Sequence, residues 1–163
     1  MIVVSNTSPL TNLAAIGQFD LLRQLYTELW IADGVWEELN VGGMRWPGRA
    51  DVAAANWIRR RTVQNQAVVT ALRRDLDRGE SESIALAIEL QADLVLLDER
   101  AGRHVAQQFG LRVIGTIGTL LEAKAKDAIG QVRPCLDALR QTAGFYLSDT
   151  VYNHALELAN EST

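Results

Sequence analysis

The chain has 163 residues, a length suited to one well-filled core, with 48% apolar and 22% charged residues. Its formal net charge of −4 gives no general attraction to nucleic acid, so any such contact needs a local basic patch or bound metal ions. The single cysteine, Cys135, excludes an intramolecular disulfide and a cysteine-cluster metal site.

No apolar run approaches the roughly 20 residues of a membrane span, and the first residues resemble a strand rather than a secretory signal. We therefore expect a cytoplasmic protein without a membrane partner.

Short apolar runs alternate with helix-like segments along the whole chain. This alternation predicts an α/β fold: a single domain over 1–163, with a mostly parallel central sheet flanked by helices on both faces. Residues 130–163 are expected to be a C-terminal helical extension of the same domain. Strands are expected at 2–5, 28–31, 57–63, 94–97 and 111–114. Helices are expected at 9–16, 19–26, 67–76, 84–90, 102–109, 116–126 and 132–141, with two more capped by Asp33 and Ser148.

Local signals predict where some of these elements begin and end. Ser8 followed by Pro9 is typical of a helix cap with proline at the first helical position. The run Asp77-Arg78-Gly79 predicts a break between two helices. Residues 40–50 are rich in glycine and turn formers, which predicts a surface loop. Cys135, in a helical stretch, is expected to be a structural thiol.

Oxygen-bearing side chains follow two of the predicted buried strands. The run Leu94–Leu97 ends directly on Asp98 and Glu99, and the first strand runs into Asn6 and its neighbours. In an open α/β sheet, ligands bind beyond the carboxyl ends of the strands. We therefore expect these two strand ends to share one site.

Further acidic residues stand at the ends or starts of other predicted elements. Glu37 and Glu38 follow the second strand, and Glu80 and Glu82 open a helix. Oxygen-only ligands suit Mg²⁺ or Mn²⁺, and several carboxylates around such ions are the arrangement used for phosphodiester hydrolysis. Each acid also has a structural explanation, as a first-turn acid, a helix cap or part of a solvated face. Spacing alone leaves these two explanations open.

Five motifs occur in order over about residues 1–130: Val3–Leu10, Val35–Leu39, Gly79–Ala87, Leu96–Arg100 and Gly115–Leu121. Together they resemble those of PIN-domain proteins, in particular the prokaryotic VapC-like toxins. The resemblance implies a metal-dependent ribonuclease fold with an acidic site at the carboxyl edge of a parallel sheet.

The resemblance also implies roles for individual residues. The metal ligands and catalytic acids would be Glu38, Asp98 and either Glu80 or Glu82, which point in different directions on one helix. Glu99 would be a further carboxylate, and Ser8 and Arg100 would support the site. Asn6 would occupy the first ligand position, where most nucleolytic relatives carry Asp. A neutral amide lowers the negative charge around the metal, so the affinity for Mg²⁺ is expected to be lower.

Basic residues suggest where RNA would lie. Arg59 and Arg61 fall on one face of the predicted strand 57–63, and Arg103 follows Asp98 by five positions. For Arg60, a charged edge strand that discourages aggregation is the favoured explanation. Trp46, in the predicted loop, is the tryptophan best placed to contact RNA or a protein partner.

The leading hypothesis is an endoribonuclease dependent on Mg²⁺ or Mn²⁺, acting as the toxin of a toxin–antitoxin pair. Its expected partners are an RNA substrate, a cognate antitoxin and a second copy in a homodimer. The alternative is a catalytically weakened domain of the same fold that binds RNA or an antitoxin. A phosphatase or phosphotransfer domain is a third reading, which the absence of paired aspartates on the first strand disfavours.

Overall fold

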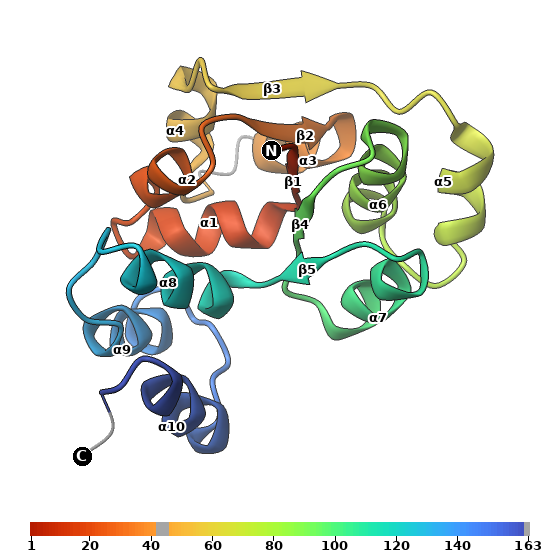
Figure 1. The fold of residues 1–163 in the computed structure, drawn as a ribbon. Coiled ribbons are helices and arrows are strands. Elements are labelled where there is room, and N and C mark those ends of the chain that lie inside the picture. Colours follow the sequence, from red (N-terminus) through yellow and green to blue (C-terminus); the bar gives the residue numbers. More distant parts are fainter. Residues whose placement is uncertain (42–45, 162–163) are drawn as a thin grey trace.

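The centre of the molecule is a parallel sheet of five strands (Figure 1), seen in a computed structural model that describes residues 1–41 and 46–161. The strand order is β3-β2-β1-β4-β5, and every pairing between neighbours is parallel. Parallel neighbours need crossover connections, which the helices provide. The structure therefore confirms the predicted α/β class. The strands are β1 (Val3–Ser5), β2 (Leu29–Ala32), β3 (Ile58–Arg61), β4 (Leu94–Leu96) and β5 (Val113–Ile114).

Helices cover both faces of this sheet and account for most of the remaining described chain. They are α1 (Thr7–Ala15), α2 (Asp20–Leu25), α3 (Asp33–Asn40), α4 (Arg49–Ala54), α5 (Gln66–Leu72), α6 (Arg78–Leu90), α7 (Arg100–Gln108), α8 (Thr116–Ala125), α9 (Arg133–Gln141) and α10 (Asp149–Leu158). Within the described ranges, no helix has the length and apolarity needed to cross a membrane.

Helices bury both faces of the sheet. Because successive strand residues point to opposite sides, neighbouring residues of one strand belong to different cores. Val3 belongs to the core under α1, α2 and α8–α10, whereas Val4 belongs to the core under α5–α7. Both valines are fully buried. Figure 1 shows these two groups of helices on opposite sides of β1 and β4. This two-sided burial explains why the central strands β1 and β4 come from continuous apolar runs rather than alternating ones. Cys135 is buried in the first core, as predicted for a structural thiol.

The predicted start of the first helix was wrong by two residues. The N-cap of α1 is Asn6, and the helix begins at Thr7. Pro9 still lies in the first turn, where its missing N–H is not needed for helical hydrogen bonding. The hydroxyl of Ser8, predicted as the cap, donates instead to Oε1 of Glu99 at 3.1 Å. The shift makes Asn6 the boundary between β1 and α1.

The predicted break between two helices is present, but it lies at residues 73–77 rather than at 77–79. Asp77 is the N-cap of α6, and its Oδ1 accepts a hydrogen bond from the backbone N–H of Glu80 at 2.8 Å. The helix therefore begins at Arg78, and Gly79 lies inside its first turn. Because α6 begins at this position, its first residues lie beside the edge of the sheet.

The predicted loop at 40–50 contains the start of a helix. α4 begins at Arg49, after Gly48, which has a left-handed φ of 88°. Residues 42–45 of this prediction lie outside the described residues. Trp46 is 40% exposed and lies with Trp36 and Arg49 around a cavity between α3 and α4.

Candidate functional site

The site begins where β1 ends, at Asn6. The backbone N–H of Asn6 donates to the carbonyl of Leu96 at 2.9 Å, which holds this residue beside the end of β4. Its side chain is only 4% exposed and makes no capping hydrogen bond. Among the described residues, its Oδ1 has no hydrogen-bond partner. A buried oxygen without a donor is costly, so this atom is available to a ligand that brings positive charge or a donor.

Glu38, from α3, lies next to the Asn6 side chain. Its Oε2 accepts a hydrogen bond from the hydroxyl of Thr7 at 2.7 Å, which orients the carboxylate. A Cβ atom placed on Gly79 would lie 3.0 Å from Oε2 of Glu38 and 3.1 Å from Oδ1 of Asn6. The missing side chain of Gly79 therefore leaves room where these two oxygens converge. A cavity of about 310 Å³, lined by Glu38, Asp77 and Gly79 among others, opens beside this point.

Glu80 lies among the other acids of the site. Its carboxyl is buried, 8% exposed. Burial, the hydrogen bond and charge of Asp77, and the negative charges of Glu99 and Glu38 together raise its pKa from 4.5 to about 8. Its Oε2 lies 2.7 Å from the position that a Cβ on Gly102 would take, so α7 closes over it. These surroundings therefore favour the protonated, neutral form of Glu80 when no cation is bound nearby.

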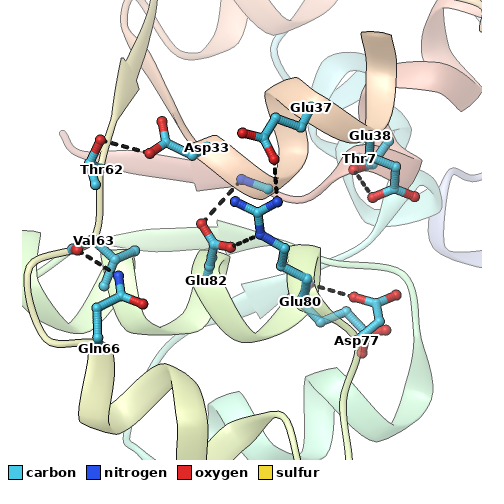
Figure 2. A network of polar contacts seen from close by, with 12 residues as sticks. Thr7, Asp33, Glu37, Glu38, Thr62, Val63, Gln66, Asp77, Glu80 and Glu82 are labelled. Atoms are coloured by element: carbon cyan, nitrogen blue, oxygen red, sulfur yellow. Dashed lines mark hydrogen bonds and ion pairs between the residues drawn. The ribbon is translucent and has the colours of Figure 1, made fainter. Parts of the chain in front are cut away.

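Glu82, two residues later, has a different environment (Figure 2). One of its oxygens accepts from the backbone N–H of Gly34 at 3.1 Å, and the other accepts from Nε of Arg78. Because residues two apart on a helix point about 200° from each other, Glu82 faces α3 rather than the other acids. The sequence left Glu80 and Glu82 as alternatives, and the structure brings only Glu80 to the acidic cluster. The carboxylate of Glu82 is already compensated by Arg78.

Asp98 follows β4, as expected, but its oxygens are engaged by two neighbouring helices. Oδ1 accepts from the backbone N–H of Thr116 at 2.7 Å, and Oδ2 accepts from the hydroxyl of the same residue at 2.8 Å. Oδ2 also accepts from Nδ2 of Asn12 at 3.2 Å. Each carboxylate oxygen has two lone-pair directions, so these bonds leave capacity for a further ligand. The contacts in the structure are with α1 and α8 and not with Glu38 or Gly79.

Glu99 completes the acidic side of the site. It is exposed, is the N-cap of α7, and accepts the hydrogen bond from Ser8 described above. Its charge contributes to the raised pKa of Glu80, which places the two carboxyls close enough to interact. Ser8 therefore acts on the orientation of Glu99.

Two residues of this cluster were missed by sequence reasoning. Thr7, which orients Glu38, stands directly after Asn6 and gives no other signal. Asp77 had a signal, because an acidic N-cap followed three positions later by Glu is typical of a capping box. Asp77 was instead predicted to be part of the break between two helices.

The chemistry of the residues present fits a divalent metal ion, but the number of carboxylates that lie close together is small. All the donors are oxygens, which suits Mg²⁺ or Mn²⁺, and the Oδ1 atom of Asn6 is buried without a partner. Over residues 1–41 and 46–161, no three His, Cys, Asp or Glu side chains gather closely enough to hold a metal by themselves. The amide oxygen of Asn6 would therefore have to be part of any ligand set together with carboxylates such as Glu38 and Glu80.

The basic residues of β3 lie away from these acids. The guanidinium groups of Arg59 and Arg61 both lie over the ring of Trp30, at 5.8 and 5.9 Å from its centroid, so the two residues share a face as predicted. Arg60 points to the other side, where it pairs with Asp33 at 2.6 Å. β3 is an edge strand of the sheet, and all three of its arginines are exposed.

The fold and the acidic edge define a nuclease-like α/β domain, and comparison with known proteins gives its family. Residues 2–161 match the PIN-domain family DUF3368, so the chain belongs to the PIN-domain family. A solved structure with this fold is a PilT N-terminus domain protein from the hyperthermophilic archaeon Sulfolobus solfataricus P2. It aligns with a TM-score of 0.58 and 20% identity, over 76% of this chain and 93% of that chain. No curated protein matches the sequence. PIN domains are generally nucleases and typically use divalent metals.

Proposed function

We propose that this protein is a metal-dependent endoribonuclease of PIN type that acts as the toxin of a toxin–antitoxin pair. The observation that supports this most strongly is the buried Oδ1 of Asn6, which has no partner among the described residues and converges with Oε2 of Glu38 beside Gly79. An oxygen pair of this kind, with the carboxyl of Glu80 among the neighbouring acids, offers the oxygen donors that a divalent cation takes. Membership of the PIN-domain family supports the reaction class.

Asn6, Glu38 and Glu80 would hold Mg²⁺ or Mn²⁺ in this proposal, with Asp98 and Glu99 as further carboxylates. Such an ion supplies an activated water and stabilises negative charge on the attacked phosphate. Thr7 keeps Glu38 directed toward Gly79 through its 2.7 Å hydrogen bond. Glu80, with a pKa of about 8, carries a proton over much of the neutral range and must lose it to act as an anionic ligand.

The proposed substrate is RNA, and the proposed protein partners are a cognate antitoxin and a second copy of the chain in a homodimer. The basic face of Arg59 and Arg61, and Arg100 and Arg103 next to Asp98, are the RNA contacts that we propose. These partners come from the family resemblance.

A binding module without activity is the second candidate, and one observation favours it. Asn6 is neutral at the position where most nucleolytic relatives carry an acid, so the site has one negative charge fewer with which to attract a metal. In this case the protein would act by binding RNA or an antitoxin with the same surface.

A cleavage assay distinguishes the two candidates. The protein is incubated with a mixed RNA substrate in Mn²⁺, Mg²⁺ or EDTA, beside Glu80→Gln, Asp98→Asn, Gly79→Ala and Asn6→Asp. Exposed Glu157 provides a matched control, Glu157→Gln. We expect metal-dependent cleavage that Glu157→Gln retains and Glu80→Gln lowers by roughly 10²-fold, the usual scale for removing one essential charge-stabilising group. Gly79→Ala should also lower it, because the added methyl fills the space between Asn6 and Glu38.

The remaining outcomes decide between the candidates. If only Asn6→Asp cuts, the site is correctly located and the natural chain is a binding module. If no version cuts with either metal, the nuclease proposal is wrong.

A further inference from the structure

A second cavity, with basic walls, lies on α7 beside the acidic cluster. It has a volume of about 390 Å³ and is lined by Asp98, Arg100, Arg103, His104 and Gln107. The four residues from α7 have the spacing i, i+3, i+4 and i+7, so they form one stripe along a single face of the helix. The stripe begins in the first turn of α7, where the positive end of the helix dipole also favours an anion.

The positive charges in this cavity are not compensated within the described part of the chain. Arg100 and Arg103 form no ion pair there, whereas Arg60 and Arg78 each pair with a carboxylate. Arg103 is half-buried, which makes an unpaired guanidinium costly. The cavity therefore has two guanidinium groups that have no carboxylate at ion-pair distance in that part of the chain.

Asp98, the acid in the lining, forms no ion pair with Arg100 or Arg103. Its oxygens accept hydrogen bonds from Thr116 and Asn12, and it lies outside ion-pair distance of Arg103. A Cβ placed on Gly115 would lie 2.7 Å from Oδ1 of Asp98 and 3.0 Å from Nη1 of Arg103. Both side chains therefore lie against Gly115, and Arg103 lines the cavity.

We propose that this cavity binds a backbone phosphate of single-stranded RNA, next to the phosphate held at the acidic cluster. A guanidinium fork matches the oxygens of a phosphate, and two arginines with a histidine and a glutamine offer donors to one diester. The choice of RNA rests on the proposed function, whereas the choice of a phosphate rests on the uncompensated arginines. Because Asn6 and Glu80 are almost completely buried, a flexible single strand reaches them more easily than a rigid duplex.

Binding of a fluorescein-labelled uridine 12-mer tests this proposal. Fluorescence anisotropy is measured in EDTA, which prevents metal-dependent cleavage, at several salt concentrations. The variants are Arg103→Ala, Arg100→Ala and Arg103→Lys, and Arg73→Ala is the control, since Arg73 is exposed on the turn after α5 and carries the same charge. Thermal unfolding of each variant checks that it is folded.

We expect Arg103→Ala and Arg100→Ala each to weaken binding several-fold at low salt. Each should also reduce the slope of log K against log salt by about 0.7, the value for one phosphate contact on a single strand. Arg73→Ala should change neither quantity, and Arg103→Lys should keep the slope because it keeps the charge.

The opposite results overturn the proposal. These are no measurable binding by the unaltered protein, or a loss in Arg73→Ala as large as that in Arg103→Ala. The test is independent of the cleavage assay. Loss of binding in Arg103→Ala without any metal-dependent cleavage would support the phosphate site and reject the nuclease, and cleavage with unchanged binding would do the reverse.

Discussion

Glu80 is the residue whose ionisation depends most strongly on the fold. In the unfolded chain its pKa would be near 4.5, and in the folded protein burial and the neighbouring acids raise it to about 8. Asn6 removes one negative charge from the same cluster, which limits the repulsion that Glu80 experiences. Because Asn6 is neutral and Glu80 can stay protonated, the site tolerates the absence of a metal.

The raised pKa of Glu80 predicts a pH dependence of stability in EDTA. Between about pH 5 and pH 8 the folded protein binds a proton at Glu80 that the unfolded chain has released, so the free energy of unfolding falls as pH rises through this window. Glu80→Gln should flatten this part of the profile, whereas Glu157→Gln should not. Urea denaturation at half-unit pH intervals measures it. Equal pH profiles for the unaltered protein and Glu80→Gln would contradict the prediction.

At the scale of elements, α3 and α6 are joined by a polar clamp (Figure 2). Arg78 on α6 contacts Glu37 on α3 as well as Glu82 on its own helix, and both contacts raise its pKa. Glu82 in turn accepts from the backbone of Gly34 at the start of α3. The clamp aligns α3 with α6, and this alignment places Glu38 beside Gly79.

Removal of the clamp should cost more stability than removal of an ordinary surface pair. Arg78→Met leaves the buried carboxylate of Glu82 with only the Gly34 N–H, and we expect a loss of about 1–2 kcal/mol, reduced by the partial exposure of Arg78. The comparison is Lys126→Met, which breaks an exposed pair with Glu122 and should cost under about 0.5 kcal/mol. Chemical denaturation gives both values. Equal losses would mean that the clamp is only a surface pair.

At the scale of the whole molecule, the sheet has two cores, and the C-terminal helices belong to one of them. Leu136 on α9 and Leu156 on α10 are buried in the cluster that includes Leu120 on α8 and Val3 on β1. The segment predicted as a helical extension therefore packs against the same face of the sheet as α1 and α8. This arrangement favours a single cooperative unit.

The positions of the tryptophans allow that cooperativity to be measured. All four, Trp30, Trp36, Trp46 and Trp57, lie in the first half of the chain, so their fluorescence does not report on α9 or α10 directly. We expect Leu136→Ala to cost about 2–5 kcal/mol and to shift the urea transitions seen by fluorescence and by circular dichroism equally. A shift seen only by circular dichroism would show that residues 130–163 unfold separately.

Much of the fold could be predicted because the signal is local. A strand buried on both faces must be a continuous apolar run, so the sequence alone locates β1 and β4 and the polar residues that follow each. Less of the site could be predicted, because a side chain's direction depends on where its helix begins. The hydrogen bond from the Glu80 N–H to Asp77 starts α6 at Arg78, before the glycine that indicated a break.

The sequence by itself therefore determined the α/β class, the parallel sheet and the presence of oxygen-bearing side chains at its carboxyl edge. Only the tertiary structure decided that Glu80 rather than Glu82 joins the acidic cluster, and that Asp98 bonds to Thr116 and Asn12. The physical reason is that hydrophobic periodicity depends on neighbouring residues, whereas the partner of a charged side chain comes from a distant part of the chain.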